Sequence, residues 1–280
     1  MSKRKGFTFI EITLFLAVTA ALFIGVAAGV SNSIFQQQYN DSTQSFFEFL
    51  KGVYSEVSNP QGAGKGDSDS AIYGRMIVFG ETTDLAGNPV PDTEQQIFTY
   101  DVVGDAVSSG TGDVKQLLKA LHANVVFVER KNNVILSVEF ALPEKYTPRW
   151  GAQIETISGS PVKKTILVVR HPRSGTINTL VLDDAIQVNE AMKSASSCIS
   201  KSSCPVITDI LTSRIDGFST DKEVDFCVDP YGLDDSGGTP RRIIRILENA
   251  RNSSSVQLLE LENRDVDEKG EKKESYNRCL

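Results

Sequence analysis

The N-terminal part of the sequence holds one long apolar segment, residues 7–30, in which Glu11 is the single ionisable side chain. A helix over these 24 residues would extend about 36 Å, enough to cross the roughly 30 Å hydrocarbon core of a bilayer. The basic residues 3–5 (Lys-Arg-Lys) come directly before it, and positive charge on this side keeps the extreme N-terminus in the cytosol. The pattern therefore predicts a membrane-spanning helix with the rest of the chain outside the cytoplasm.

The helix is expected to continue beyond the membrane as an amphipathic stem. Apolar residues recur at spacings of three, four or seven and form one stripe on an otherwise polar helix: Phe35, Tyr39, Phe46, Leu50, Val53 and Val57. Asn59 and Pro60 mark the end, because the residue before a proline is pushed out of the helical conformation. One helix over residues 7–58 is therefore predicted, apolar all round in its first half and striped in its second.

The remaining residues, 63–280, are expected to form one large exported head domain or two small ones. Short runs of β-branched and aromatic residues predict strands at 72–79, 96–103, 125–129, 134–140, 165–170, 176–182, 224–228, 242–247 and 256–261. Turn residues predict hairpins, and hence antiparallel pairing, at 131–133, 172–175 and 249–255. Helices are predicted at 113–122, 185–196 and 205–213. The fold class is α+β, with the long helix packed on an antiparallel sheet.

The start of the apolar segment does not fit an ordinary secretory signal, whose apolar region is shorter and is followed by a small-residue cleavage site. Here the small residue, Gly6, lies on the cytosolic side. The basic leader, Gly6, Phe7 and then Thr-Phe-Ile-Glu at 8–11 resemble the class III signal of type IV pilins and of type II secretion pseudopilins. This resemblance implies that residues 1–6 are a leader peptide, that prepilin peptidase cuts after Gly6, and that the new amine of Phe7 is N-methylated.

Glu11 would then be the fifth residue of the mature chain, where this family places a glutamate. A carboxylate inside a membrane helix costs about 2.5–3.5 kcal/mol on insertion scales, and such a residue is expected to be functional. The resemblance implies that Glu11 meets the N-terminal amine of a neighbouring subunit, which would set the register between subunits. Gly25 and Gly29 form a Gly-x-x-x-Gly pair that either lets helices approach closely or is merely tolerated. Many pilins carry a proline late in this segment, and this sequence departs from them in having none there.

The four cysteines all lie outside the membrane segment, so an oxidising compartment would give two disulfides. Cys198 and Cys204 bracket a short polar segment that can close on itself, whereas Cys227 lies in a predicted strand and Cys279 ends a charged tail. We therefore predict that Cys198 pairs with Cys204 and that Cys227 pairs with Cys279. The resemblance points the same way, since many pilins staple a C-terminal loop to the sheet. Zinc is the less favoured alternative, because there is no Cys-x-x-Cys pair.

Signs of catalysis or metal binding are few. The acidic loop with Asp229, Asp234 and Asp235 offers oxygen ligands for Ca²⁺, but it lacks the alternation of an EF-hand, and solvated loop charges are the commoner explanation. The glycine-rich residues 62–66 lack the Ser or Thr that follows the lysine of a phosphate-binding loop. No nucleophile or metalloprotease motif occurs, so we expect neither a catalytic residue nor a cofactor.

One predicted hairpin carries four arginines that could contact DNA phosphates: Arg241, Arg242, Arg245 and Arg251. Against this, removal of the leader lowers the net side-chain charge from −7 to −10, and a strongly acidic exported chain is not typical of a general nucleic-acid binder. Arginines on a sheet also commonly serve only to solvate its face. DNA is therefore a possible but not a favoured partner.

The resemblance implies a structural subunit, and the large head favours a minor pilin or pseudopilin of a type IV pilus or of a type II secretion-like filament. Its partners would be sibling pilin subunits bound through the N-terminal helix, prepilin peptidase and the inner-membrane assembly machinery. It would cross the cell membrane once and then enter an extracellular pilus or a periplasmic pseudopilus. The alternative is a DNA- or surface-binding minor pilin used in DNA uptake or adhesion. A membrane-anchored enzyme is the third and least favoured class.

Overall fold

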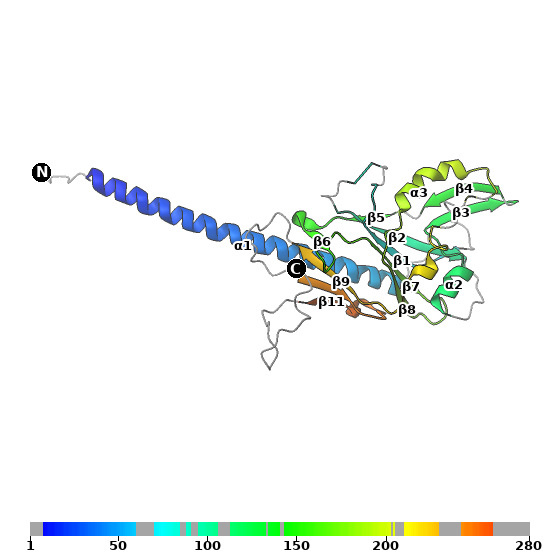
Figure 1. Cartoon of the computed structure of the whole chain (residues 1–280). Helices are drawn as coiled ribbons and strands as arrows, with labels where there is room; N and C mark the ends of the chain where they lie inside the picture. Colours follow the sequence, from blue (N-terminus) through cyan, green and yellow to red (C-terminus); the bar gives the residue numbers. More distant parts are fainter. Residues whose placement is uncertain are drawn as a thin grey trace, which may run out of the picture.

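A computed structural model of the chain describes residues 8–59, 70–84, 88–90, 95–105, 113–132, 134–140, 143–202, 204, 210–229 and 242–259. One long helix, α1 (Phe9–Ser58), runs from the N-terminal side into a head built on antiparallel sheets (Figure 1). The first half of α1 projects away from the head, and the second half lies along it (Figure 1). The predicted α+β layout, with a long N-terminal helix and antiparallel strands, is confirmed.

Both ends of α1 follow from local sequence. Thr8 is the N-cap: its hydroxyl accepts the N–H of Glu11, and the Glu11 carboxylate accepts the N–H of Thr8, which forms a capping box. At the other end, Asn59 leaves the helical conformation while its N–H still reaches the carbonyls of Ser55 and Glu56. The 50 residues between make a helix about 75 Å long. Its described extent agrees with the prediction of one helix over 7–58.

The larger sheet has five strands in the order β5-β2-β1-β7-β8, with every neighbouring pair antiparallel. In chain order these strands are β1 (Ser70–Phe79), β2 (Ile97–Asp105), β5 (Glu144–Tyr146), β7 (Lys164–Arg170) and β8 (Ile177–Leu182). The β7–β8 turn closes with Gly175 at φ +69°, in the left-handed region that glycine adopts without strain. Gly74 is also required in β1, because a Cβ there would lie 2.1 Å from the carbonyl oxygen of Val168 in β7.

A second sheet has four strands in the order β11-β10-β9-β6, and β3 and β4 form a separate hairpin, again all antiparallel. Their bounds are β3 (Val126–Lys131), β4 (Val134–Phe140), β6 (Gln153–Glu155), β9 (Val224–Asp229), β10 (Arg242–Ile246) and β11 (Val256–Leu259). Asn132 lies in the turn between β3 and β4, and Asn249 lies in the connection between β10 and β11. Both have positive φ, a conformation that asparagine tolerates. The short helices are α2 (Val114–Ala120), α3 (Val188–Ala195), η1 (Arg149–Gly151), η2 (Ser196–Cys198), η3 (Ile215–Gly217) and η4 (Ser253–Ser255).

All the strands predicted from β-rich runs are present in the described residues, and so are the helices predicted at 113–122 and 185–196. Two three-residue strands, β5 and β6, were not predicted. The helix predicted at 205–213 is wrong where the structure describes it, since residues 210–213 form turns. The Arg214 N–H donates to the carbonyl oxygen of Leu211 at 3.0 Å, a tight bond between residues three apart, in place of the four-residue spacing of an α-helix. The glycine-rich residues 62–66 and the charged tail that carries Cys279 lie outside the described residues.

The five-stranded sheet is buried on both faces. One apolar cluster joins one face to the C-terminal half of α1 and to the four-stranded sheet. The opposite face packs on α2, on the segment around α3 and on the β3–β4 hairpin. The second half of α1 is therefore an internal element of the head and not a linker to it.

Aromatic rings and hydroxyls fix α1 to both sheets. The fully buried ring of Phe46 meets Phe79 of the five-stranded sheet at 6.3 Å and Phe226 of the four-stranded sheet at 5.6 Å, both edge to face. The Tyr39 hydroxyl donates to the carbonyl oxygen of Val228 at 3.0 Å and accepts the N–H of Arg242 at 2.6 Å. The predicted apolar stripe is confirmed from Tyr39 onward. The prediction is wrong for the first member of the stripe, Phe35, which is 41% exposed on the projecting part of the helix and does not pack on the head.

Candidate functional site

The projecting half of α1 exposes an unusually large apolar surface. Its large apolar side chains, each between 41% and 81% exposed, are Phe9, Ile10, Ile12, Leu14, Phe15, Leu16, Val18, Leu22, Phe23, Ile24, Val26, Val30, Ile34 and Phe35. They follow one another too closely to form a single stripe, so this half is apolar all round. Such a continuous patch exceeds what a free soluble protein presents and marks a surface that meets lipid or other chains. Among the described helices, α1 alone is long and apolar enough to cross a membrane.

Three hydroxyl groups in this half are satisfied by backbone carbonyls of the helix itself. Thr13 donates to the carbonyl oxygen of Ile10 at 3.0 Å, and Thr19 donates to that of Phe15 at 2.9 Å. Farther along, the Ser31 hydroxyl donates to the carbonyl oxygen of Ala27 at 3.0 Å. A polar group without a partner in hydrocarbon costs several kcal/mol, and these bonds remove that cost. The surface is therefore compatible with a lipid surrounding despite its threonines and serine.

Glu11 is the exception in this apolar surface. Its Oε2 accepts the N–H of Thr8 at 2.8 Å and the Thr8 hydroxyl at 3.0 Å, so the carboxylate lies at the positive end of the helix. Within the part of the chain that the structure describes, no cation lies within ion-pair distance of it. Local hydrogen bonds orient Glu11 without neutralising it, and a cation from elsewhere would complete the site.

Gly25 and Gly29 lie on the same helix, with no atom within 4 Å of the position that a Cβ would take at either. Each glycine therefore leaves an open notch on the monomer, as a close helix–helix contact would require. The predicted cleavage and methylation residues, Gly6 and Phe7, lie outside the described residues. The structure thus places Glu11 and the two glycines on one exposed helix, and the cleavage site stays a prediction.

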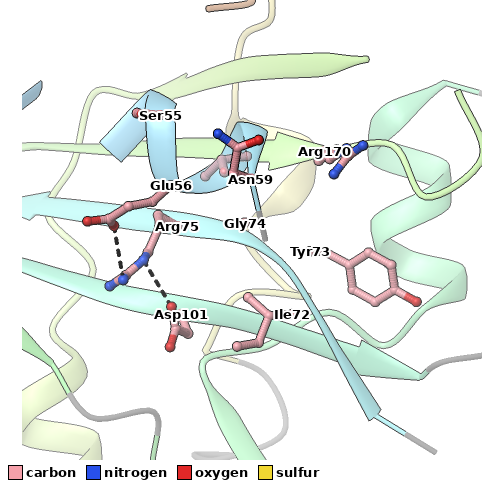
Figure 2. A pocket seen from close by; sticks show the side chains of 10 residues that line it. Ser55, Glu56, Asn59, Ile72, Tyr73, Gly74, Arg75, Asp101 and Arg170 are labelled. Atoms are coloured by element: carbon pink, nitrogen blue, oxygen red, sulfur yellow. Dashed lines mark ion pairs between the residues drawn. The ribbon is translucent and has the colours of Figure 1, made fainter. Parts of the chain in front are cut away.

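A cavity of about 550 Å³ lies where the stem meets the head. It is lined by the last turns of α1, by β1 and β2, and by Arg170 of β7. Figure 2 shows Arg75 between Glu56 of α1 and Asp101 of β2, with both carboxylates 3.0 Å from the guanidinium. Burial is the main cause that raises the pKa of Asp101. Arg170 donates to the carbonyl oxygen of Ser58 at 3.4 Å. These contacts hold the end of α1 on the sheet. The two carboxylates also neutralise Arg75, so its charge is not available to an anionic ligand.

The described residues that were candidates for DNA binding are engaged within the head. Arg245 contacts Asp225 at 2.7 and 3.0 Å and Glu223 at 3.0 Å. The Arg242 guanidinium lies over the ring of Tyr39, 5.7 Å from its centroid. Arg251 is exposed beyond β10, and Arg241 lies outside the described residues. The structure therefore does not bring these arginines together as one free cationic surface.

The cysteine prediction is confirmed in its first half: Cys198 and Cys204 form a disulfide with their Cα atoms 5.6 Å apart. Cys227, buried in β9, is also disulfide-bonded. Its predicted partner, Cys279, lies outside the described residues, so that pairing stays a prediction.

The predicted calcium ligands are not assembled by the described part of the head. Asp229 ends β9, whereas Asp234 and Asp235 lie outside the described residues. Among the residues that the structure places, no three His, Cys, Asp or Glu side chains form a group that could hold a metal. Calcium binding at this loop therefore stays an untested prediction.

Sequence reasoning missed the burial of Glu81, which is 4% exposed beside the first turn of α3. Its Oε1 accepts the N–H of Val188 at 2.9 Å and lies 2.9 Å from the Tyr100 hydroxyl, while Asn189 donates its N–H at 3.3 Å. Burial raises the pKa of Glu81 to about 7, and the nearby charge of Glu190 acts in the same direction. A lone glutamate after a strand carries no sequence signal of such burial. We assign it a structural role, because its neighbours are backbone amides of the head.

The features available for a functional inference are thus an exposed apolar half-helix, one carboxylate within it and a disulfide-bonded head. No protein-family model matches the sequence, and no curated protein or solved structure matches the chain. The function is therefore inferred from these residues and their geometry.

Proposed function

We propose that this chain is a pilin-like structural subunit, a minor pilin or pseudopilin, made as a prepilin and cut after Gly6. Its helix α1 anchors it in the membrane and then packs with sibling subunits in a pilus or pseudopilus. The observation that carries the proposal is the division of α1: the second half forms the core of the head, and the first half exposes apolar side chains all round. Lipid before assembly and neighbouring helices after it would each cover that surface.

Glu11 gives the proposal its assembly step. Cutting after Gly6 creates an amine on Phe7, and a carboxylate in hydrocarbon needs a cation. In a growing filament the amine of one subunit would meet the Glu11 carboxylate of another. A subunit in the wrong register would leave both charges unpaired in an apolar surrounding, so the pair selects the correct register.

The disulfides support an exported head. Cys198 and Cys204 are bonded, and Cys227 is bonded as well. Disulfides persist in oxidising compartments and are rare in the cytosol. This location agrees with the orientation expected from the basic residues 3–5.

Substitution of Glu11 tests the proposal. Glu11→Gln removes the charge and keeps the capping box, because glutamine also serves at that position. In cells with the filament machinery, we expect the variant to insert into the membrane as well as or better than the wild type. Its amount in sheared filaments should fall by about tenfold or more, given a cost of about 2.5–3.5 kcal/mol for an unpaired charge.

Glu248→Gln is the matched control, since Glu248 is exposed on the head and loses the same charge. This variant should enter filaments at the wild-type level. Wild-type amounts of the Glu11→Gln protein in filaments would contradict the proposed assembly role.

A further inference from the structure

Trp150, the only tryptophan in the chain, is 53% exposed, although tryptophan is highly buried on average. It lies in η1 with φ +60° and ψ +23°, a left-handed conformation that is a genuine outlier for a bulky side chain. Such a conformation persists only where the surrounding structure enforces it, and it concentrates at functional positions. Because the ring of Trp150 is half exposed and its backbone is strained, stabilisation of the head does not explain its position.

The surroundings fix η1 against α1, which it contacts directly. Just before η1, the ring of Tyr146 stacks on Phe49 of α1 at 4.5 Å. Just after it, Ala152 and Ile154 are buried in the cluster shared with α1. The exposed ring of Trp150 therefore sits on a rigid support beside the stem, between two anchored segments.

This support precedes β6, a strand that lies close to the point where α1 enters the head. Ile154 of β6 pairs with Val228 of β9, whose carbonyl oxygen accepts the hydroxyl of Tyr39, the first buried residue of the apolar stripe. Figure 1 shows β6 at the end of the head toward the projecting half of α1, with β3 and β4 at the opposite end. Phe35, still 41% exposed, precedes Tyr39 by four residues, or about 6 Å along the helix. The base of the head, meaning its end around Tyr39, therefore begins about one helical turn after Phe35, the last exposed apolar residue of the stem.

We propose that Trp150 seats the base of the head in the membrane–water interface before the subunit enters a filament. The occupant of this surface is the headgroup region of a phospholipid bilayer. This inference rests on the proposed function, because it requires α1 to span the membrane. Tryptophan is enriched at membrane interfaces, where its apolar ring and its N–H donor are both accommodated. The adjacent exposed Arg149 supplies a cation at the level of the lipid phosphates.

The length of α1 supports this seating. The apolar part of α1 from Phe9 to Val30, before the polar residues 31–33, spans about 33 Å, slightly longer than the roughly 30 Å hydrocarbon core. A helix longer than the core accommodates itself by tilting, and a tilt lowers one side of the head toward the membrane. Interfacial aromatic residues select which side is lowered. Trp150 therefore selects the side of the head that carries η1 as the side brought toward the membrane.

Because the chain has one tryptophan, its fluorescence reports on this ring without any substitution. We would reconstitute the full chain in phosphatidylcholine vesicles containing lipids brominated at a shallow or a deep acyl position, and confirm anchoring by flotation. We expect emission shifted to shorter wavelength than in vesicle-free detergent solution. Shallow bromines should remove about half of the emission and deep bromines clearly less, as for a ring at the headgroup boundary.

A relocated tryptophan is the matched control. Leu136 of β4 is 45% exposed, close to the exposure of Trp150, and β4 lies at the far end of the head (Figure 1). The double variant Trp150→Phe and Leu136→Trp should float with the vesicles, show no quenching by either brominated lipid, and remain fully open to iodide in the aqueous phase.

Two results would overturn the inference while leaving the membrane anchor intact. The first is a wild-type chain that floats with the vesicles but shows no quenching by brominated lipid while iodide quenches its tryptophan freely. The second is a ring shielded from iodide yet insensitive to brominated lipid, which would assign Trp150 to a contact with another copy of the chain. A chain that does not float would overturn the membrane anchor itself and the seating of Trp150 with it.

Discussion

The two halves of α1 are equally continuous as helix but are built for different surroundings. The C-terminal half carries one apolar stripe that is buried in the head, with polar side chains on its other faces. The N-terminal half is apolar around its whole circumference, and none of the side chains whose burial the structure describes there is buried inside the molecule. An element that packs on one side needs a stripe, whereas an element inside lipid or a helical bundle needs apolar residues on every side. The angular distribution of apolar residues therefore indicates the surroundings of each half.

The sharpest test of this division is the same substitution made in each half. Phe46→Ala removes a fully buried ring that joins both sheets, and we expect it to lower the free energy of unfolding of the head by about 3–5 kcal/mol. Phe23→Ala truncates a ring that is 80% exposed and should leave that free energy unchanged. Denaturant unfolding of the full chain in detergent measures both. Equal losses would mean that the two halves are not distinct.

A positive charge added to each half should affect membrane insertion only when it lies in the N-terminal half. Leu16→Lys puts a cation on the exposed apolar half and should cost about 2.5–3.5 kcal/mol of membrane insertion, which moves much of the protein out of the carbonate-resistant membrane fraction. Gln37→Lys adds the same charge at an exposed polar position near the head and should leave that fraction unchanged. Comparable losses for both variants would show that the boundary between the halves lies elsewhere.

The head should also differ from the projecting half in its response to pH. Burial raises the pKa of Glu81 to about 7 from an ordinary value of 4.5, so the folded head binds this proton more tightly than the unfolded chain. The resulting stability is fully present below about pH 4.5 and is lost as the pH rises toward 7, by an amount on the order of 3 kcal/mol.

Substitutions near Glu81 separate this contribution from others. Glu81→Gln should flatten the dependence of unfolding free energy on pH between 4.5 and 7. Glu190→Gln, which removes the facing carboxylate of α3, should shift the same dependence to lower pH. Glu11→Gln should leave the pH dependence of the head unchanged, and a change there would show that the two regions are coupled.

Much of this division could be predicted from the sequence, because it depends on local patterns. The capping residue Thr8, the stop at Asn59 and the stripe from Tyr39 to Val57 are local, and so are the runs that form the longer strands. Glu11 and the glycines could be found because a charge and a small-residue pair stand out in an apolar segment. The proposed pairing of Glu11 with the amine of Phe7 stays a prediction, because Phe7 lies outside the described residues.

The features that could not be predicted depend on contacts between distant segments. The sequences of β5 and β6 are Glu-Lys-Tyr and Gln-Ile-Glu, which carry no strand pattern; β2 and β9 impose the extended conformation by pairing with them. The division of strands between two sheets likewise follows from their packing around α1. Burial of Glu81 and exposure of Trp150 reverse the usual preferences of those residue types, so only the structure reveals them.

The most direct test of the central claim is the mass of the mature protein after expression together with a prepilin peptidase. We expect a chain that begins at Phe7 and carries one added methyl group, because the Lys-Arg-Lys-Gly-Phe junction places the cleavage bond before the apolar segment. The same expression without the peptidase should yield the uncut chain. A mature chain that still begins at Met1 in the presence of the peptidase, or that is cut after the apolar segment, would contradict the pilin-like function.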